Sequence, residues 1–218
     1  MNLYRLADFI RYNMQEGLGF KGSIAEEYLK RNTKYKNEGD VNFELLRSIV
    51  NSRKKPPEQD TVSIHARLGD ILSPRNANYI SMNNLPSFPD IILKHNLHKK
   101  YKNCSIYYGN HKIGTPGVAN VDKSKTILNN IVTNLSNMGL DTKIISNSAD
   151  EDFISLSTCL CYISGIRGFG WLSASINPNT VYWDNHNIPN FSWERYPEQQ
   201  IKKSLMKGYN YHLSIKTT

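Results

Sequence analysis

The chain has few cysteines, no long apolar run and fewer acidic than basic residues. Its three cysteines, among 218 residues, lack the spacing of a disulfide framework, so we expect reduced thiols. A membrane-spanning helix needs about 20 consecutive apolar residues, and no stretch of the sequence supplies them. The first 18 residues mix apolar positions with Arg5, Asp8 and Arg11, which is an amphipathic pattern rather than a signal peptide. We therefore expect a soluble, cytoplasmic protein, unless the chain is a domain cut from a longer protein whose leader was lost.

The formal net charge of +8 favours an anionic partner. Such a partner could be a nucleic acid, an acidic membrane or a phosphorylated ligand. The basic residues are dispersed, and only Arg53-Lys54-Lys55 and Lys99-Lys100 cluster. The aromatic signatures of the common RNA-binding modules are missing from the sequence. We expect no specific nucleic-acid partner, although a basic nucleic-acid-binding module remains an alternative.

The pattern of apolar residues divides the chain into three parts. Residues 1–58 read as a helical N-terminal segment, a possible reduced acceptor-binding region, and residues 191–218 read as a tail that packs back on the fold. Residues 59–190 alternate strands with helices, which predicts a Rossmann-like α/β domain: a parallel sheet with helices on both faces. The expected strands are 61–67, 105–108, 143–146, 161–164 and 180–183.

A candidate binding motif ends the first of these strands. Side chains alternate along a strand, so His65 and Arg67 project the same way, just before the Gly69-Asp70 turn. Ligands of open α/β sheets bind at the carboxyl edge, and a guanidinium there suits a phosphate. A purely structural alternative is an arginine that caps a loop and a histidine satisfied in the core.

A glycine turn follows the fourth expected strand. Ser164 and Gly165 lead into a helix expected over 166–176, whose first backbone N–H groups and dipole favour an anion. Arg167 adds a cation. Close packing of a helix on a sheet is the structural alternative for these glycines.

The acidic pair before that strand has two interpretations as well. Asp150-x-Asp152 has the form of a metal-binding motif, but Ser148 and Glu151 have the spacing of a capping box, which favours acidic residues in the first turn of a helix. Cys159-x-Cys161 has no second cysteine pair or nearby histidine. We therefore expect no bound metal.

Taken together, the two segments resemble the fucosyltransferase superfamily of the GT-B fold, and the pattern is most similar to α-1,2-fucosyltransferases. The first segment resembles the His-x-Arg-x-Gly-Asp motif at 65–70, and the match extends over residues 60–184 with gaps. The second resembles the C-terminal motif in which an acidic residue and Phe open a helix and a strand ending in Ser turns into Phe-x-Trp-x-x-Ala. Its matching positions here are Asp152-Phe153, Leu156, Cys159, Ser164, Phe169, Trp171, Ala174, Asn177-Pro178-Asn179 and Tyr182-Trp183.

The resemblance implies a nucleotide-diphospho-sugar donor, with a GDP-sugar as the first expectation, and no separate cofactor. It implies that Arg67 holds the β-phosphate, that His65 lines the nucleotide pocket, and that Asp150 or Asp152 binds the edge of the base. The phosphate cradle would consist of Ser164, Gly165 and the turn that runs through Arg167 and Gly168 to Phe169. Such enzymes are typically inverting and independent of metal.

We therefore predict a glycosyltransferase that moves fucose or another deoxyhexose to a hydroxyl of a glycan acceptor. A base must activate that hydroxyl, and Asp70 is the nearest candidate. The alternative is a non-catalytic domain that binds a nucleotide-sugar or a glycan.

Overall fold

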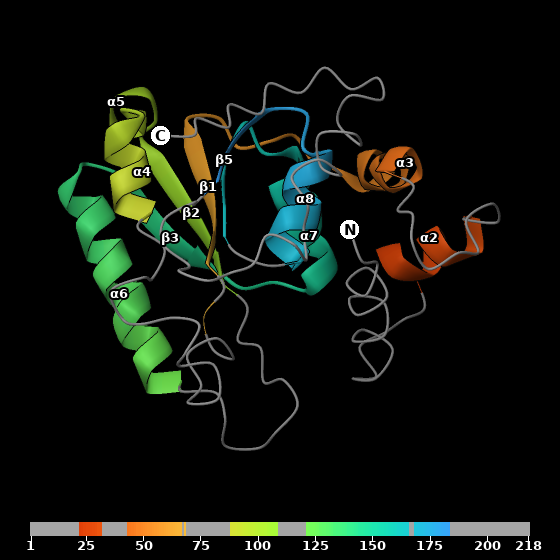
Figure 1. Cartoon of the computed structure of the whole chain (residues 1–218), viewed down its shortest axis with the longest axis horizontal. Helices are drawn as coiled ribbons and strands as arrows, with labels where there is room; N and C mark the ends of the chain where they lie inside the picture. Colours follow the sequence, from red (N-terminus) through yellow and green to blue (C-terminus); the bar gives the residue numbers. More distant parts are fainter. Residues whose placement is uncertain are drawn as a thin grey trace, which may run out of the picture.

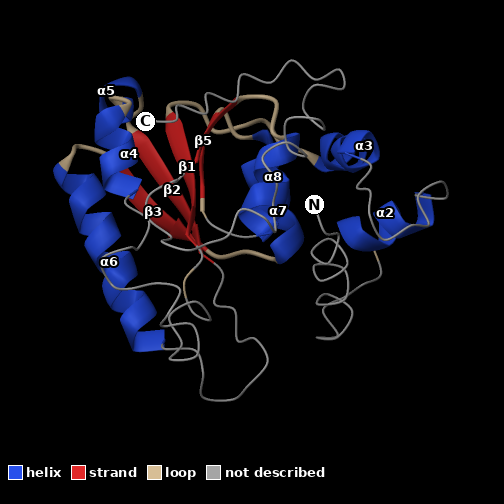
Figure 2. Ribbon diagram, in the orientation of Figure 1, coloured by secondary structure: helices blue, strands red, loops and turns tan. Residues whose placement is uncertain are grey.

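Five parallel strands form the centre of the protein in a computed structural model that describes residues 22–31, 43–66, 68, 88–108, 121–165 and 168–183. The strand order is β3-β2-β1-β4-β5, and every neighbouring pair is parallel (Figure 2). The direction of winding reverses at β1, which is the doubly wound order of a Rossmann-like sheet. The predicted parallel sheet is thereby confirmed. Its strands are β1 Thr61–Ala66, β2 Asn103–Tyr108, β3 Asp141–Ile145, β4 Cys161–Ser164 and β5 Thr180–Trp183.

Helices cover both faces of the sheet, as the alternating pattern predicts (Figure 1). One face carries α4 (Phe88–Lys94), α5 (Leu97–Lys100) and α6 (Val121–Asn137). The other carries α7 (Ala149–Thr158) and α8 (Gly168–Ile176). Outside that second layer lie α2 (Ile24–Arg31) and α3 (Phe43–Arg53).

The burial of β1 explains why this strand sits in the middle of the sheet. All six of its residues are buried, which requires cover on both faces. Val62, Ile64 and Ala66 share one core with residues of α4 and α6, whereas His65 points to the face of α7 and α8, where its ring contacts Phe169.

The N-terminal helices share a core with the sheet domain. Tyr28 of α2 and Ile49 of α3 are buried in one cluster with Phe153 of α7 and Leu172 of α8. The expected helical segment therefore packs directly on the second helix layer. The residues around position 58 connect α3 to β1.

Local stop and start signals in the sequence agree with the structure. Gly139 takes a left-handed conformation (φ +85°) after α6, and the amide of Leu140 donates to the carbonyl of Leu135, as in a Schellman-type end. Ser148 and Glu151 form the expected capping box at the start of α7.

Three features differ from the sequence prediction or lie beyond the description. The asparagines and prolines over residues 76–89 predict a loop, but Phe88 and Pro89 begin α4, and the sequence predicts neither α4 nor α5. The helical pattern at 3–14 and the tail at 191–218 lie outside the described residues. None of the described helices has the length and apolar character needed to cross a membrane.

The cysteines are confirmed as buried free thiols. Burial raises the pKa of Cys104 and of Cys159 to about 12, and that of Cys161 to about 11. Because the thiolate is the reactive form, these residues are chemically inert at neutral pH.

Candidate functional site

The two motif segments meet where the strand order reverses. His65 is the penultimate residue of β1, Ser164 is the last residue of β4, and these strands are neighbours in the sheet. Open α/β sheets bind ligands at the carboxyl edge beside such a reversal. We call the residues gathered there, His65, Ser164, Gly165, Phe169 and Gly170, the switch-point site.

Two glycines allow the turn after β4 to lie directly on the end of β1. A Cβ atom on Gly165 would overlap the backbone carbonyl oxygen of His65. A Cβ atom on Gly170 would overlap Nδ1 of the His65 ring and would also stand 2.9 Å from the carbonyl oxygen of Gly165. The glycines at 165 and 170 are therefore required by close approach, which is the role that glycine plays in dinucleotide-binding turns.

Aromatic contacts hold the His65 ring against the second helix layer. The ring centroids of His65 and Phe169 are 5.3 Å apart, and Phe169 meets Phe153 of α7 edge-on at 5.6 Å. His65 is only 4% exposed, so most of its surface is packed within the protein, as the structural alternative of a core histidine predicts. The contacts also join α7 and α8 to the end of β1.

A buried hydroxyl network fixes the first turn of α8 on β4. The Tyr162 hydroxyl donates to the carbonyl of Gly170 at 3.2 Å and lies 2.9 Å from Oγ of Ser173, which donates to the same carbonyl at 2.9 Å. Oγ of Ser164 donates to the carbonyl of Gly165 at 3.1 Å. Sequence reasoning missed Tyr162 and Ser173, because their partnership spans the strand-to-helix turn. This network holds the backbone of the switch-point site in place.

The three acidic residues of the first turn of α7 have different surroundings. Glu151 completes the capping box with Ser148. Oδ2 of Asp150 accepts from the backbone N–H of Ile24 at 2.8 Å, at the start of α2. Asp152 is 7% exposed, and its Oδ1 accepts from Nδ2 of Asn147 at 3.2 Å.

Burial raises the pKa of Asp152 from an ordinary carboxyl value to about 6, and Glu151 adds a smaller push in the same direction. Hydrogen bonds from Asn147 oppose the shift. A buried carboxyl that titrates near neutrality, one residue from the Phe153–Phe169 contact, is the kind of group found in binding sites. Asp150 and Asp152 are the two candidates to bind the edge of the nucleotide base, and Asp152 is the one packed inward.

The Asn-Pro-Asn segment after α8 has a structural task. Nδ2 of Asn177 donates to the carbonyls of Leu156 and Cys159 at 2.8 and 3.1 Å, and its Oδ1 accepts from the amide of Asn179 at 2.7 Å. This buried side chain ties the end of α7 to the start of β5.

Several expected site residues are not covered by the description. Arg67, Asp70 and Arg167 lie outside the described residues, so their roles stay predictions, and Gly168 begins α8. Within the described ranges, no three His, Cys, Asp or Glu side chains gather in a way that could hold a metal ion.

Comparison with known proteins adds no assignment. No family model matches the chain, and no curated protein matches its sequence.

Proposed function

We propose that the chain is a glycosyltransferase that uses a nucleotide-diphospho-sugar, most readily a GDP-sugar, and a glycan hydroxyl as acceptor. One observation carries the proposal: the two segments that resemble fucosyltransferase motifs, about a hundred residues apart, come together at the reversal of strand order, with Gly165 and Gly170 against His65. That position is where a Rossmann-like sheet holds the phosphates of a nucleotide.

In this proposal the diphosphate lies at the start of α8. The first backbone N–H groups of a nine-residue helix and its dipole favour negative charge. Arg67 neutralises the charge that grows on the diphosphate as the bond from the sugar C1 to oxygen breaks. Asp70 takes the proton of the acceptor hydroxyl while that oxygen bonds to C1 from the opposite face, which inverts the anomeric centre. The transferred group is fucose or another deoxyhexose.

Binding is tested by isothermal titration with GDP, UDP and dTDP. We expect saturable binding of one of these, with GDP the tightest, and weaker binding in a Gly170→Ala variant that remains folded by circular dichroism. A matched control is Gly139→Ala, which changes a glycine far from the site with open space around it. No binding of any nucleoside diphosphate to the parent chain would refute the proposal.

Transfer is tested by the release of GDP from GDP-fucose in the presence of a mixed glycan pool. Release above the buffer rate supports an enzyme. Tight GDP binding without hydrolysis or transfer would favour the non-catalytic binding domain instead.

A further inference from the structure

We propose that Arg53 and Asp150 form a clamp that positions the acidic first turn of α7, and with it Asp152, beside the switch-point site. Asp150 is then a positioning residue rather than a contact to the base. The proposal rests on the proposed function for its consequence in binding. It rests on contacts within the chain for the clamp itself.

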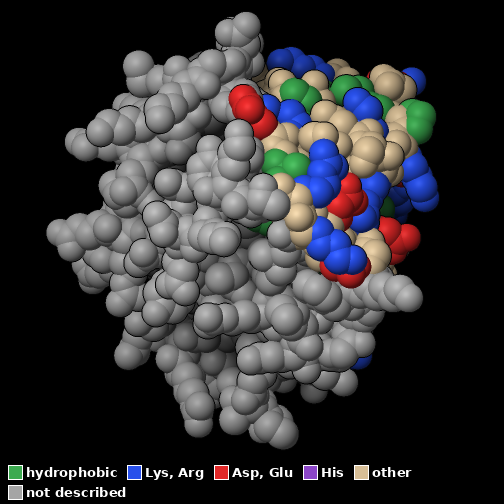
Figure 3. Space-filling model, turned by 90° about the vertical axis from the view of Figure 1, so that its right-hand side faces the viewer, with side chains coloured by type: hydrophobic (Ala, Val, Ile, Leu, Met, Phe, Trp, Pro, Cys, Tyr) green, Lys and Arg blue, Asp and Glu red, His purple; other side chains and the backbone are tan. Residues whose placement is uncertain are grey.

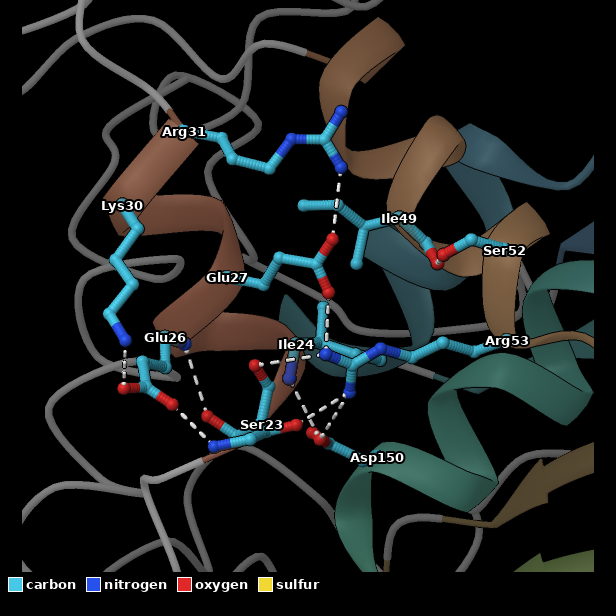
Figure 4. A network of polar contacts seen from close by, with 11 residues as sticks. Ser23, Ile24, Glu26, Glu27, Lys30, Arg31, Ile49, Ser52, Arg53 and Asp150 are labelled. Carbon is cyan, nitrogen blue, oxygen red and sulfur yellow. Dashed lines mark hydrogen bonds and ion pairs between the residues drawn. The ribbon is translucent and has the colours of Figure 1, made fainter.

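Three elements far apart in sequence meet at this clamp (Figure 4). Arg53 is the last residue of α3, Asp150 lies in the first turn of α7, and the start of α2 lies between them. Oδ2 of Asp150 accepts the amide of Ile24 at 2.8 Å and lies 3.8 Å from Nη1 of Arg53. The carboxylate therefore caps a second helix as well as pairing with a cation.

Both terminal nitrogens of the Arg53 guanidinium bind groups at the start of α2. Nη1 donates to the carbonyl of Gly22 at 2.8 Å, and Nη2 donates to Oε2 of Glu27 at 2.6 Å. Hydrogen bonding to Arg53 is the main reason why the pKa of Glu27 is lowered. A lysine could supply the charge but could not span these partners at once.

The clamp is partly shielded from water. The side chains of Arg53, Asp150 and Glu27 are 27%, 24% and 29% exposed. Arg31 binds the other oxygen of Glu27 at 2.9 Å but is 47% exposed. Among the described residues visible on the side of the molecule nearest α2 and α3, basic and acidic side chains lie next to one another (Figure 3). An internal joint explains these charges better than an anionic partner does.

The joint connects to the site through the adjacent residues of α7. Phe153 packs in the core shared with α2 and α3 and meets Phe169, which meets His65. Asp152 is buried on the same turn, and the groups that influence its titration are Glu151 on its own helix and Asn147 before that helix. The charge of Asp152 in turn contributes to raising the pKa of Tyr107 on β2. If the turn is released, Asp152 gains contact with water.

The test measures the pKa of Asp152 by carboxyl carbon NMR in the full chain and in two variants. Arg53→Gln should lower that pKa by roughly one unit, because a released turn is better solvated. Loss of the Arg53 charge alone could only raise it, so the sign separates movement of the turn from direct electrostatics. Arg31→Gln is the matched control: it removes the other cation of Glu27, leaves the Asp150 contact intact, and should not shift the pKa.

Affinity for GDP-fucose at neutral pH gives the second readout. The diphosphate keeps one charge state there, so a change in affinity reports on the protein. We expect about tenfold weaker binding in Arg53→Gln, the scale of one charge-assisted hydrogen bond, and no change in Arg31→Gln. Arg53→Lys keeps the charge but cannot span the partners of the guanidinium, and it should shift the pKa in the same direction if Arg53→Gln does not fold. An unchanged or raised Asp152 pKa in these variants overturns the clamp. A parent chain that binds no GDP-fucose overturns the proposed function, while the NMR result still decides the clamp.

Discussion

Replacing Gly165 by alanine tests the central contact of the site. The added methyl would overlap the carbonyl oxygen of His65, which is part of the β1 backbone. That carbonyl cannot withdraw by a side-chain rotation, so the end of β1 or the turn after β4 must move. Overpacking of this kind costs typically 1–3 kcal/mol and can cost more where the obstacle is backbone. We expect Gly165→Ala to lower the free energy of unfolding by about 3 kcal/mol.

Gly139→Ala provides the reference for this measurement. Gly139 has open space around its Cα but a left-handed φ of +85°, so alanine there suffers only the conformational strain, about 1 kcal/mol. Urea unfolding followed by far-UV circular dichroism gives both values, and the melting temperature should fall about 2–4 °C for each kcal/mol in a chain of this size. The reasoning is refuted if Gly165→Ala loses no more stability than Gly139→Ala.

Three further perturbations address charge and chemistry. Asp152→Asn should stabilise the fold by about 2 kcal/mol at pH 7.5 and hardly at pH 4. The reason is that the pKa of the Asp152 carboxyl is raised to about 6 in the folded state, so this group destabilises the fold as the pH rises from its ordinary pKa to 6. Chemical denaturation at the two pH values measures the effect, and equal effects at both would contradict the prediction. Arg67→Lys should weaken GDP binding about ten- to a hundredfold by calorimetry, since it keeps the charge and loses the fork, whereas unchanged affinity would remove Arg67 from the phosphate site. Transfer or donor hydrolysis should survive EDTA, and loss of activity restored by manganese would instead favour metal at Asp150-x-Asp152.

The sheet was predictable because its strands carry strong local signals. β4 and β5 have the predicted bounds, and β1 has the predicted start and runs through Ala66, beyond which Arg67 lies outside the described residues. Strands buried on both faces appear as short apolar runs between turn residues, and the runs around Ile64 and Ile163 are of that kind. The helices α4 and α5 were missed because seven and four residues are too few to show a helical period, and Pro89 indicated a loop.

The site was predictable only in part, because it depends on contacts between residues that are far apart in the sequence. The sequence placed His65 and Gly165 at strand ends, and topology then made those ends neighbours. It could not show that Gly165 and Gly170 touch His65, since that depends on how close the turn lies to β1.

The acidic turn of α7 shows the same division between local and tertiary information. Spacing identified Glu151 as the capping partner of Ser148, and the structure confirms it. Spacing left Asp150 and Asp152 equivalent, two residues apart on one turn. Only the arrival of α2 and α3 separates them, because the Ile24 amide and the Arg53 guanidinium occupy Asp150 while Asp152 faces the interior. A residue 97 positions earlier in the chain thus pairs with Asp150, and no local pattern around residue 150 contains that information.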